Sequence, residues 1–219
     1  MRIFVLLLAA VSAFAQANDF SPQSPAFTPV IDQPGLPRVL LIGDSISIGY
    51  TVTVRKELAG QASIHRILEN GADTANGLKK IDGWLGDSKW DVIHFNWGLH
   101  DLKVTADGGR QVPIETYETN LALLVARLKR TGARLIWAAT TPVPNGKQNP
   151  PREPADPPKY NAAAKRVMET SGIATNDLYT AALPRLSEIQ LPINVHFNNT
   201  GWEFLGKQVA AAIRSELHR

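Results

Sequence analysis

A serine and a histidine that lie far apart in the sequence have the types and positions needed for nucleophilic chemistry. Ser45 follows a short apolar run and lies near the start of the next predicted helix, where backbone N–H groups favour negative charge. His196 lies just before the last predicted helix, and an imidazole is the usual base for a serine because its pKa is close to neutrality. Each has a simpler interpretation alone, because Ser45 or Asp44 could cap the helix and a lone histidine is often structural. His196, however, is placed at the opening of the C-terminal helix, from which it can reach back to the edge of the sheet where Ser45 is expected.

Two further clusters of polar residues could hold the negative charge that forms when a serine attacks a carbonyl. Residues 95–101 (Phe-Asn-Trp-Gly-Leu-His-Asp) and 69–74 (Glu-Asn-Gly-Ala-Asp-Thr) each follow an apolar run. Burying a polar group without a partner costs ~1–3 kcal/mol, so polar clusters behind buried strands need a reason. Hydrogen-bond donors in these clusters would face an oxyanion, and the loss of one such donor typically costs ~3–4 kcal/mol.

Apolar runs that alternate with helical patterns supply the framework for these residues. Strands are predicted at residues 38–42, 91–96 and 133–139, with weaker patterns at 63–68 and 172–175. Apolar residues at helical spacing predict helices at 115–130, 160–170 and 200–217, the last with Thr200 as its N-cap, and shorter ones at 52–58 and 78–85. This alternation predicts βαβ units and a parallel sheet.

In parallel α/β sheets, ligands bind beyond the carboxyl ends of the strands. The chemistry is therefore expected just after residues 42, 68, 95 and 139, and in the loop before the last helix. Thr140 and Thr141 close the fourth strand at this edge, and we expect them to line the pocket. Residues 141–159 contain seven prolines, which predicts an irregular loop that covers one side of the site.

The order of these motifs resembles the four sequence blocks of the GDSL/SGNH hydrolase family. The Gly-Asp-Ser turn at 43–45, the Asn-Gly turn at 70–71, the Gly-x-x-Asp element at 98–101 and the late His196 follow one another as the blocks do, and the resemblance covers roughly residues 37–216. It implies that Ser45 attacks an acyl carbon and that His196 is its base. It also implies a flavodoxin-like, three-layer α/β/α sandwich with about five parallel strands.

In the family, the oxyanion is held by the serine N–H, a glycine N–H of the second block and an asparagine side chain of the third. Here His100 replaces that asparagine; its imidazole N–H can still donate, and Asn96 is a second possible donor nearby. The glycine of the second block falls on Ala72, with Gly71 one residue away, and either residue has the required N–H. The resemblance therefore implies an oxyanion hole of Ser45, Gly71 or Ala72, and His100.

The acid of the family lies three residues before the histidine, and this position is Ile193 here. Asn194 lies two residues before it, and neither is a carboxylate. A serine-protease triad loses ~10⁴ in rate when its Asp becomes Asn. Three outcomes stay open: a backbone carbonyl near Pro192 orients His196 in a Ser–His dyad, which we favour; a carboxylate comes from elsewhere; or the enzyme is slow or inactive.

Two acidic residues of the blocks have a supporting role by the same resemblance. Asp44 and Asp101 could each be interpreted as a catalytic acid, but in the family they mainly fix the turns of the site by hydrogen bonding. Asn96 and Asn194 are expected to support the site alongside them.

The beginning of the sequence has the features of an exported protein. Arg2 precedes an almost wholly apolar run at 3–14, and small residues follow at 13–17. This predicts a secretory signal peptide at 1–17, because the run is shorter than the ~20 residues of a spanning helix; an uncleaved membrane anchor is the alternative. Residues 18–37 are predicted to be an extended leader and 38–219 the catalytic domain. The expected location is secreted or periplasmic, with no stable membrane insertion after cleavage.

Composition narrows the partners and cofactors. The net charge is +3 and the basic residues are scattered, whereas a nucleic-acid binder would show a clustered basic stripe. No His-Glu-x-x-His motif, cysteine, phosphate loop or dinucleotide fingerprint is present, so neither a metal nor a cofactor is expected. There is no Gly-x-Ser-x-Gly elbow of an α/β-hydrolase either.

The expected partner is a small-molecule or glycan ester, and the oligomeric state is left open. Exported members of the family often act on polysaccharides, so the expected function is hydrolysis of O-acetyl esters on a carbohydrate. A lipid ester or thioester hydrolase, and a non-catalytic carbohydrate-binding module that has kept the fold, are the alternatives.

Overall fold

Five parallel strands form a single sheet in the computed structural model, which describes residues 19–219. The strand order is β2-β1-β3-β4-β5, and the strands are β1 (Arg38–Ile42), β2 (Ser63–Arg66), β3 (Val92–Phe95), β4 (Arg134–Ala138) and β5 (Ala174–Asn176). All four residues of β3 are buried, His94 included, as expected for a strand covered on both faces. Ile42 pairs with Phe95, so the segments that follow β1 and β3 begin at the same edge.

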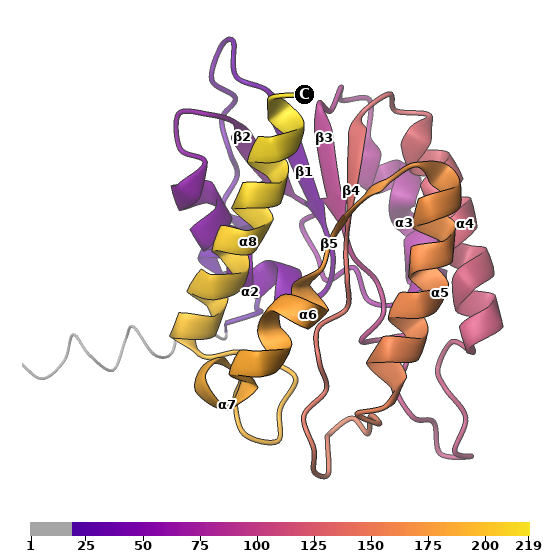
Figure 1. Cartoon of the computed structure of the whole chain (residues 1–219). Coiled ribbons are helices and arrows are strands. Elements are labelled where there is room, and N and C mark those ends of the chain that lie inside the picture. The colour runs from indigo at the N-terminus through magenta and orange to yellow at the C-terminus, as the bar shows by residue number, and fades with distance from the viewer. Residues whose placement is uncertain (1–18) are drawn as a thin grey trace, which may run out of the picture.

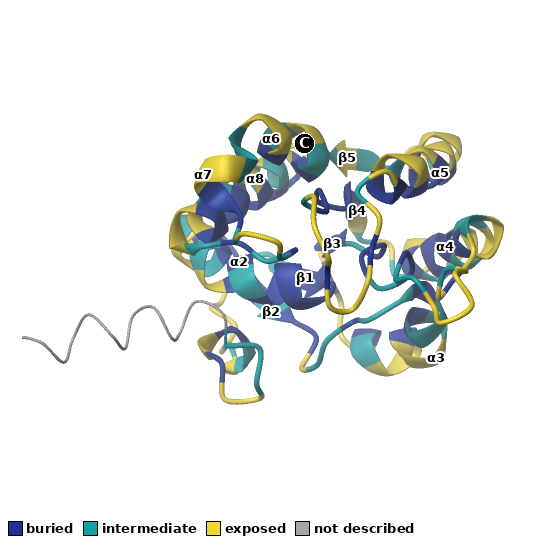
Figure 2. Ribbon diagram, turned by 90° about the horizontal axis from the view of Figure 1, so that it is seen from below, coloured by how far each residue is buried: buried dark blue, intermediate teal, exposed yellow. Residues whose placement is uncertain are grey.

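Helices cover both faces of this sheet (Figure 1). The helices α2 (Ser45–Glu57) and α8 (Asn199–Leu217) lie on one face, and α3 (Thr74–Leu85), α4 (Ile114–Lys129) and α5 (Asp156–Ser171) lie on the other. Figure 2 looks along the sheet and shows the buried strands between the two helical layers. The predicted three-layer α/β/α sandwich with about five parallel strands is confirmed. Short helices lie between β5 and α8: α6 (Leu178–Ala182), η2 (Leu183–Arg185) and α7 (Leu186–Ile189).

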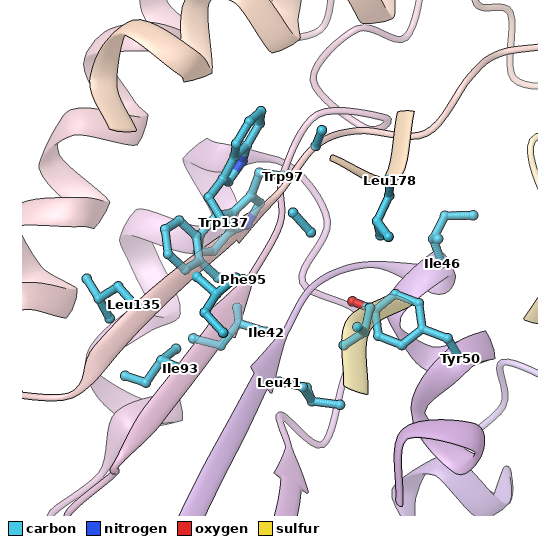
Figure 3. Packing of buried hydrophobic residues seen from close by; sticks show 14 of the residues in the cluster. Leu41, Ile42, Ile46, Tyr50, Ile93, Phe95, Trp97, Leu135, Trp137 and Leu178 are labelled. Atoms are coloured by element: carbon cyan, nitrogen blue, oxygen red, sulfur yellow. The ribbon is translucent and has the colours of Figure 1, made fainter. Parts of the chain in front are cut away.

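The pair α2–α8 packs closely because glycines face the neighbouring helix. A Cβ atom on Gly49 would lie 2.6 Å from the ring of Trp202, and one on Gly206 would lie 2.5 Å from Thr53. This close packing fixes α2, which begins at Ser45, against α8, which begins just after His196. The core between the sheet and the other helical layer contains Trp97 and Trp137 (Figure 3), and both are fully buried.

Several helix boundaries differ from the sequence predictions. The helix predicted at 52–58 begins at Ser45, and the one predicted at 78–85 begins at Thr74. The first turns of both helices contain small and polar residues, so apolar spacing does not mark them, and each turn follows an Asp N-cap. The N-cap of α8 is Asn198, whose side chain accepts a hydrogen bond from the Gly201 N–H, and not Thr200. The proline-rich loop ends before residue 156: Pro157 and Pro158 lie in the first turn of α5, where no N–H is needed.

Residues 19–37 are mostly irregular and pack against the rest of the fold. The helix η1 (Pro25–Phe27) lies against α2, and the Arg55 side chain donates to the Pro25 carbonyl at 3.1 Å. The Arg66 guanidinium lies over the Phe27 ring. The predicted signal peptide at 1–17 and the first residue of the leader lie outside the described residues. Between residues 19 and 219, no helix has both the length and the apolar character required to cross a membrane.

Candidate active site

Ser45 and His196 meet at the carboxyl edge of the sheet. The Ser45 Oγ lies 2.8 Å from the His196 Nε2, although 151 residues separate them in the sequence. Ser45 is the first residue of α2, and the carboxylate of the N-cap Asp44 accepts a hydrogen bond from the Ile46 N–H at 2.9 Å. The site lies between the ends of β1 and β3, where the strand order reverses direction. A non-catalytic carbohydrate-binding module would not need Ser45 and His196 in contact. Their hydrogen-bond distance therefore gives that alternative no support.

Asn194 fixes the imidazole of His196 in the tautomer that a general base requires. Its side-chain Oδ1 lies 3.0 Å from the His196 backbone N and 2.8 Å from the His196 Nδ1. A backbone N–H can only donate, so the atom that it faces must be the amide oxygen. The same oxygen accepts from Nδ1, so the proton is on Nδ1 and Nε2 is free to accept the hydroxyl proton of Ser45.

The prediction that a backbone carbonyl near Pro192 orients His196 is wrong, because the Asn194 side chain occupies that role. No carboxylate of the described residues forms a hydrogen bond with His196. Ile193, at the position of the family's acid, has a φ of 50°, which is unfavourable for a β-branched residue. Burial lowers the pKa of His196 below its ordinary value, and Arg152 lowers it further while Asp44 opposes the shift. The imidazole is therefore neutral near pH 7.

His100 has a similarly defined tautomer. The Lys103 Nζ lies 2.9 Å from the His100 Nδ1. A protonated lysine has no acceptor, so it donates to Nδ1 and leaves the proton of a neutral imidazole on Nε2. Burial lowers the pKa of His100 as well, which keeps it neutral. His100 lines the same cavity as Ser45 and can donate an Nε2–H there.

The backbone donors proposed for the second block are occupied. The Gly71 N–H donates to the Gly43 carbonyl at 3.0 Å, so the prediction that it serves the oxyanion is wrong. The Ala72 N–H donates to the Asn70 side-chain oxygen at 2.9 Å and is free for a ligand only when Asn70 releases it. The Ser45 N–H begins α2 and has no acceptor among the residues described.

Three other predicted residues face away from the cavity. The Asn96 amide donates to the Ala138 carbonyl at 2.7 Å, so it joins the ends of β3 and β4 and is not a second oxyanion donor. Thr140 is buried and its hydroxyl donates to the Trp97 carbonyl. Thr140 and Thr141 do not line the cavity around Ser45, contrary to expectation.

Asp101 connects the turn after β3 to the start of α3. One oxygen of its carboxyl accepts from both the N–H and the hydroxyl of Thr74, at 2.9 and 2.6 Å. Its other oxygen is buried and has no hydrogen-bond partner within residues 19–219. Burial raises the pKa of Asp101 to about 7, and the bonds from Thr74 oppose the rise. The residue holds the turn that carries His100 and does not contact Ser45 or His196.

The cavity beside Ser45 has a volume of about 430 Å³ and also contains residues that the sequence did not single out. Among these are Phe20 from the N-terminal segment, Lys103 after β3, and Arg152 from the proline-rich loop. The loop was expected to cover one side of the site. It lines the cavity with Lys147, Gln148, Asn149, Pro150 and Arg152. Phe20 had no sequence signal, because its role depends entirely on where the segment packs.

The sequence matches the model of the GDSL-like lipase/acylhydrolase family over residues 41–203. The chain belongs to this family. The matched range includes Ser45, His100 and His196, so the resemblance seen in the sequence blocks is confirmed. The family and the Ser45–His196 pair make this GDSL-like protein a serine hydrolase that acts on ester bonds.

Solved structures with the same fold share little sequence with this GDSL-like chain. An acetyl xylan esterase, AlAXEase, is 14% identical with a TM-score of 0.69, covering 80% of this chain and 99% of that one. A lipase/acylhydrolase from Enterococcus faecalis is 22% identical with a TM-score of 0.68, covering 82% and 96%. A catalytic mutant of Axe2, an acetylxylan esterase from Geobacillus stearothermophilus, is 18% identical with a TM-score of 0.66, covering 85% and 96%. Comparison with curated proteins gives no significant sequence match.

The side chains of the described residues do not form a metal site in this GDSL-like fold. Over residues 19–219, no three His, Cys, Asp or Glu residues come together in a way that could hold an ion.

Proposed function

We propose that this GDSL-like hydrolase is an exported esterase that removes O-acetyl groups from a carbohydrate through an acyl-enzyme on Ser45. The proposed reaction is supported mainly by one observation. Hydrogen bonds run continuously from the Ser45 hydroxyl through His196 to Asn194, and each is 2.8 Å long. This set of bonds begins in a cavity large enough for an acetyl group and part of its alcohol. The nucleophile, its base and the group that orients the base are thus already aligned.

In the first step, the Ser45 Oγ attacks the acyl carbon while its proton moves to the His196 Nε2. The imidazolium that forms keeps its Nδ1–H bonded to the Asn194 oxygen. The carbonyl oxygen becomes an oxyanion, and the Ser45 N–H and the His100 Nε2–H are the donors that can stabilise it. When the intermediate collapses, His196 returns the proton to the leaving alcohol and the acetyl group stays on Ser45.

The second step regenerates the enzyme with the same groups. A water molecule attacks the acetyl carbon of the acyl-enzyme, and His196 accepts one of its protons. Collapse of this second oxyanion breaks the bond to the Ser45 Oγ, which takes the proton back from His196. Acetate leaves, and the free hydroxyl is restored.

Two observations favour an acetylated carbohydrate over a lipid. Many of the side chains that line the cavity are polar, including Asn70, His100, Lys103, Gln148 and Arg152, whereas a long acyl chain needs a continuous apolar lining. Two of the similar folds described above are acetylxylan esterases, which makes this chemistry plausible for the architecture and is an argument by analogy.

The catalytic proposal is tested by p-nitrophenyl acetate hydrolysis with the wild type, Ser45→Ala and His196→Ala. We expect activity in the wild type and a loss of about 10³-fold or more in either variant. Acyl specificity is tested by comparing p-nitrophenyl acetate with the octanoate, and by measuring acetate released from acetylated xylo-oligosaccharides. Preference for the octanoate would support a lipid esterase instead.

Export is tested by expressing the full sequence and determining the N-terminus of the protein recovered outside the cytoplasm. The apolar run and the small residues at 13–17 lead us to expect a mature protein that begins at Asn18. A protein that retains residues 1–17 would contradict the proposed cleavage.

A further inference from the structure

The charged residues around the active-site cavity are unbalanced. Lys103, Lys147 and Arg152 line it, and Asp44 is the one carboxylate among its lining residues. One oxygen of Asp44 is already used to cap α2. None of the ion pairs formed within residues 19–219 involves any of the three cations. The cavity therefore presents an excess of positive charge to whatever enters it.

Arg152 is the most informative of these cations because it is buried. Its exposed fraction is 8%, and arginine is almost never buried without an anionic partner. Its Nε donates to the Leu99 carbonyl at 2.7 Å and its Nη1 to the Pro150 carbonyl at 3.2 Å. Its Nη2 has no hydrogen-bond partner in the part of the chain that the structure describes. Two main-chain carbonyls orient the guanidinium. Burial lowers the pKa of Arg152 and the charge of Asp44 opposes that shift, but Asp44 does not come close enough to form an ion pair with Arg152 within residues 19–219.

Resting on the esterase function proposed above, we propose that the substrate carries a carboxylate on its alcohol part, as an O-acetylated uronic acid does, and that Arg152 binds this carboxylate. A guanidinium held in a fixed orientation is suited to a planar carboxylate. The acetyl group itself is small, so most of the cavity is available to the alcohol part. Lys103 and Lys147 add attraction at longer range.

The inference is tested with two acetate esters that differ in charge but release similar phenols: 4-acetoxybenzoate and its neutral methyl ester. The readout is the ratio of kcat/KM for the acid to kcat/KM for the neutral ester, measured from phenol release. We expect Arg152→Lys and Arg152→Gln to lower this ratio by about tenfold or more, and Lys147→Gln by about twofold. Increasing NaCl from about 20 mM to about 500 mM should lower kcat/KM for the acid only.

Lys79→Gln is the matched control for net charge. Lys79 is exposed and does not line the cavity, so this variant removes one positive charge and should leave the ratio unchanged. A ratio that Arg152→Lys and Arg152→Gln leave unchanged, in enzymes that still hydrolyse the neutral ester, would overturn the inference while leaving the esterase function intact.

A second measurement covers the case in which the Arg152 variants do not fold or the wild type hydrolyses neither ester. Calorimetry with the wild-type protein compares benzoate with benzamide, which has the same shape and no charge. We expect benzoate to bind at least about tenfold more tightly. Equal affinity would overturn the inference on its own, whereas tight benzoate binding without hydrolysis would refute the esterase function and keep the anion site.

Discussion

The ring of Phe20 lies against the imidazole of His196, with ring centroids 4.7 Å apart and planes inclined by 32°. Phe20 also contacts Trp202 of α8, edge to face, at 6.2 Å. A residue of the N-terminal segment thus covers part of the His196 imidazole, which is half-buried. Contacts of this kind contribute about 0.5–1.5 kcal/mol, and here they hold an imidazole that must keep its orientation during catalysis.

Phe20→Ala is therefore expected to lower kcat/KM for p-nitrophenyl acetate by about threefold to tenfold. Because burial is the main cause of the lowered His196 pKa, the variant should also move the acidic limb of the pH–rate profile upward. Phe20→Leu keeps an apolar side chain, so its kcat/KM should lie between the values of the wild type and Phe20→Ala. An unchanged rate and pH profile in Phe20→Ala would show that the contact is only structural.

Replacing Asn194 tests how the histidine is oriented. In Asn194→Ala, the Nδ1–H and the backbone N–H of His196 both lose their acceptor, and kcat should fall by about 10- to 100-fold. In Asn194→Asp, a carboxylate would stabilise the imidazolium, so the pKa of His196 should rise and the acidic limb should move to higher pH. We expect kcat of Asn194→Asp at pH 8 to equal or exceed that of the wild type; a fall of tenfold or more would contradict this role for Asn194.

His100→Ala tests the oxyanion donor that the third block supplies here. We expect kcat to fall by about 10²-fold or more while KM changes little. His100→Asn should retain most of the activity because an amide can donate from a similar position. Lys103→Met leaves the tautomer of His100 undefined and should cost about threefold to tenfold. Activity of His100→Ala within about twofold of the wild type would exclude His100 from the oxyanion hole.

Asp101 should make the fold less stable as the pH rises. Its folded pKa of about 7 lies above the ordinary value of 3.8, so the protonated form is favoured by folding. Its contribution to the unfolding free energy is fully present below pH 4 and is lost as the pH rises through 7. Buried His94, whose pKa is lowered to about 3, has the opposite effect between pH 3 and 6.5.

The comparison of the wild type with Asp101→Asn isolates the first effect, since His94 is common to both. The difference in unfolding free energy, wild type minus variant, should decrease between pH 4 and pH 8 in urea titrations. The amide in Asp101→Asn would leave a buried polar group without a partner, which lowers the unfolding free energy of the variant by about 1–3 kcal/mol at every pH. The test is therefore how the difference changes with pH, and its absolute size is not used. A pH-independent difference would show that Asp101 is charged in both states or neutral in both.

Ala72 is strained and glycine should relieve the strain. Its φ is 51°, a left-handed conformation that costs an L-residue about 1–2 kcal/mol and costs glycine almost nothing. We expect Ala72→Gly to raise the unfolding free energy by about 0.5–1 kcal/mol after the entropy cost of glycine. Ala126→Gly, at an exposed position of α4, should instead lower it by about 1 kcal/mol. Equal effects at the two positions would contradict the strain at Ala72.

The sheet and the larger helices could be predicted because local sequence encodes them. The run at 38–42 is apolar from residue 39 onward, and the run at 91–96 contains Val92, Ile93 and Phe95. Short apolar runs of this length are typical of a buried parallel strand. The start of α2 could not be found in this way. Its first residues, Ser45, Ile46 and Ser47, are all buried, so they do not show the apolar spacing of an amphipathic helix.

The contact between Ser45 and His196 could be predicted for a different reason: the two residues lie in motifs whose order identifies the family. The contacts that tune the pair could not. The donation of the Gly71 N–H to Gly43, the approach of Phe20 to His196 and the position of Arg152 all depend on tertiary packing between distant segments. Asn194 lies in the motif, but only the turn geometry shows that its side-chain oxygen faces both the backbone N and the ring Nδ1 of His196.

The proline-rich loop has a thermodynamic consequence for substrate binding. Arg152 connects it to the Leu99 carbonyl, and the Val104 N–H donates to the Pro151 carbonyl at 2.9 Å. The wall of the cavity is thus already ordered before substrate arrives, and the conformational entropy of these residues is lost during folding. Substrate binding avoids a cost of about 0.5–1.5 kcal/mol for each side chain that a mobile loop would have to immobilise. Loosening this loop by a glycine at a proline position should therefore weaken affinity even where no contact with substrate is removed.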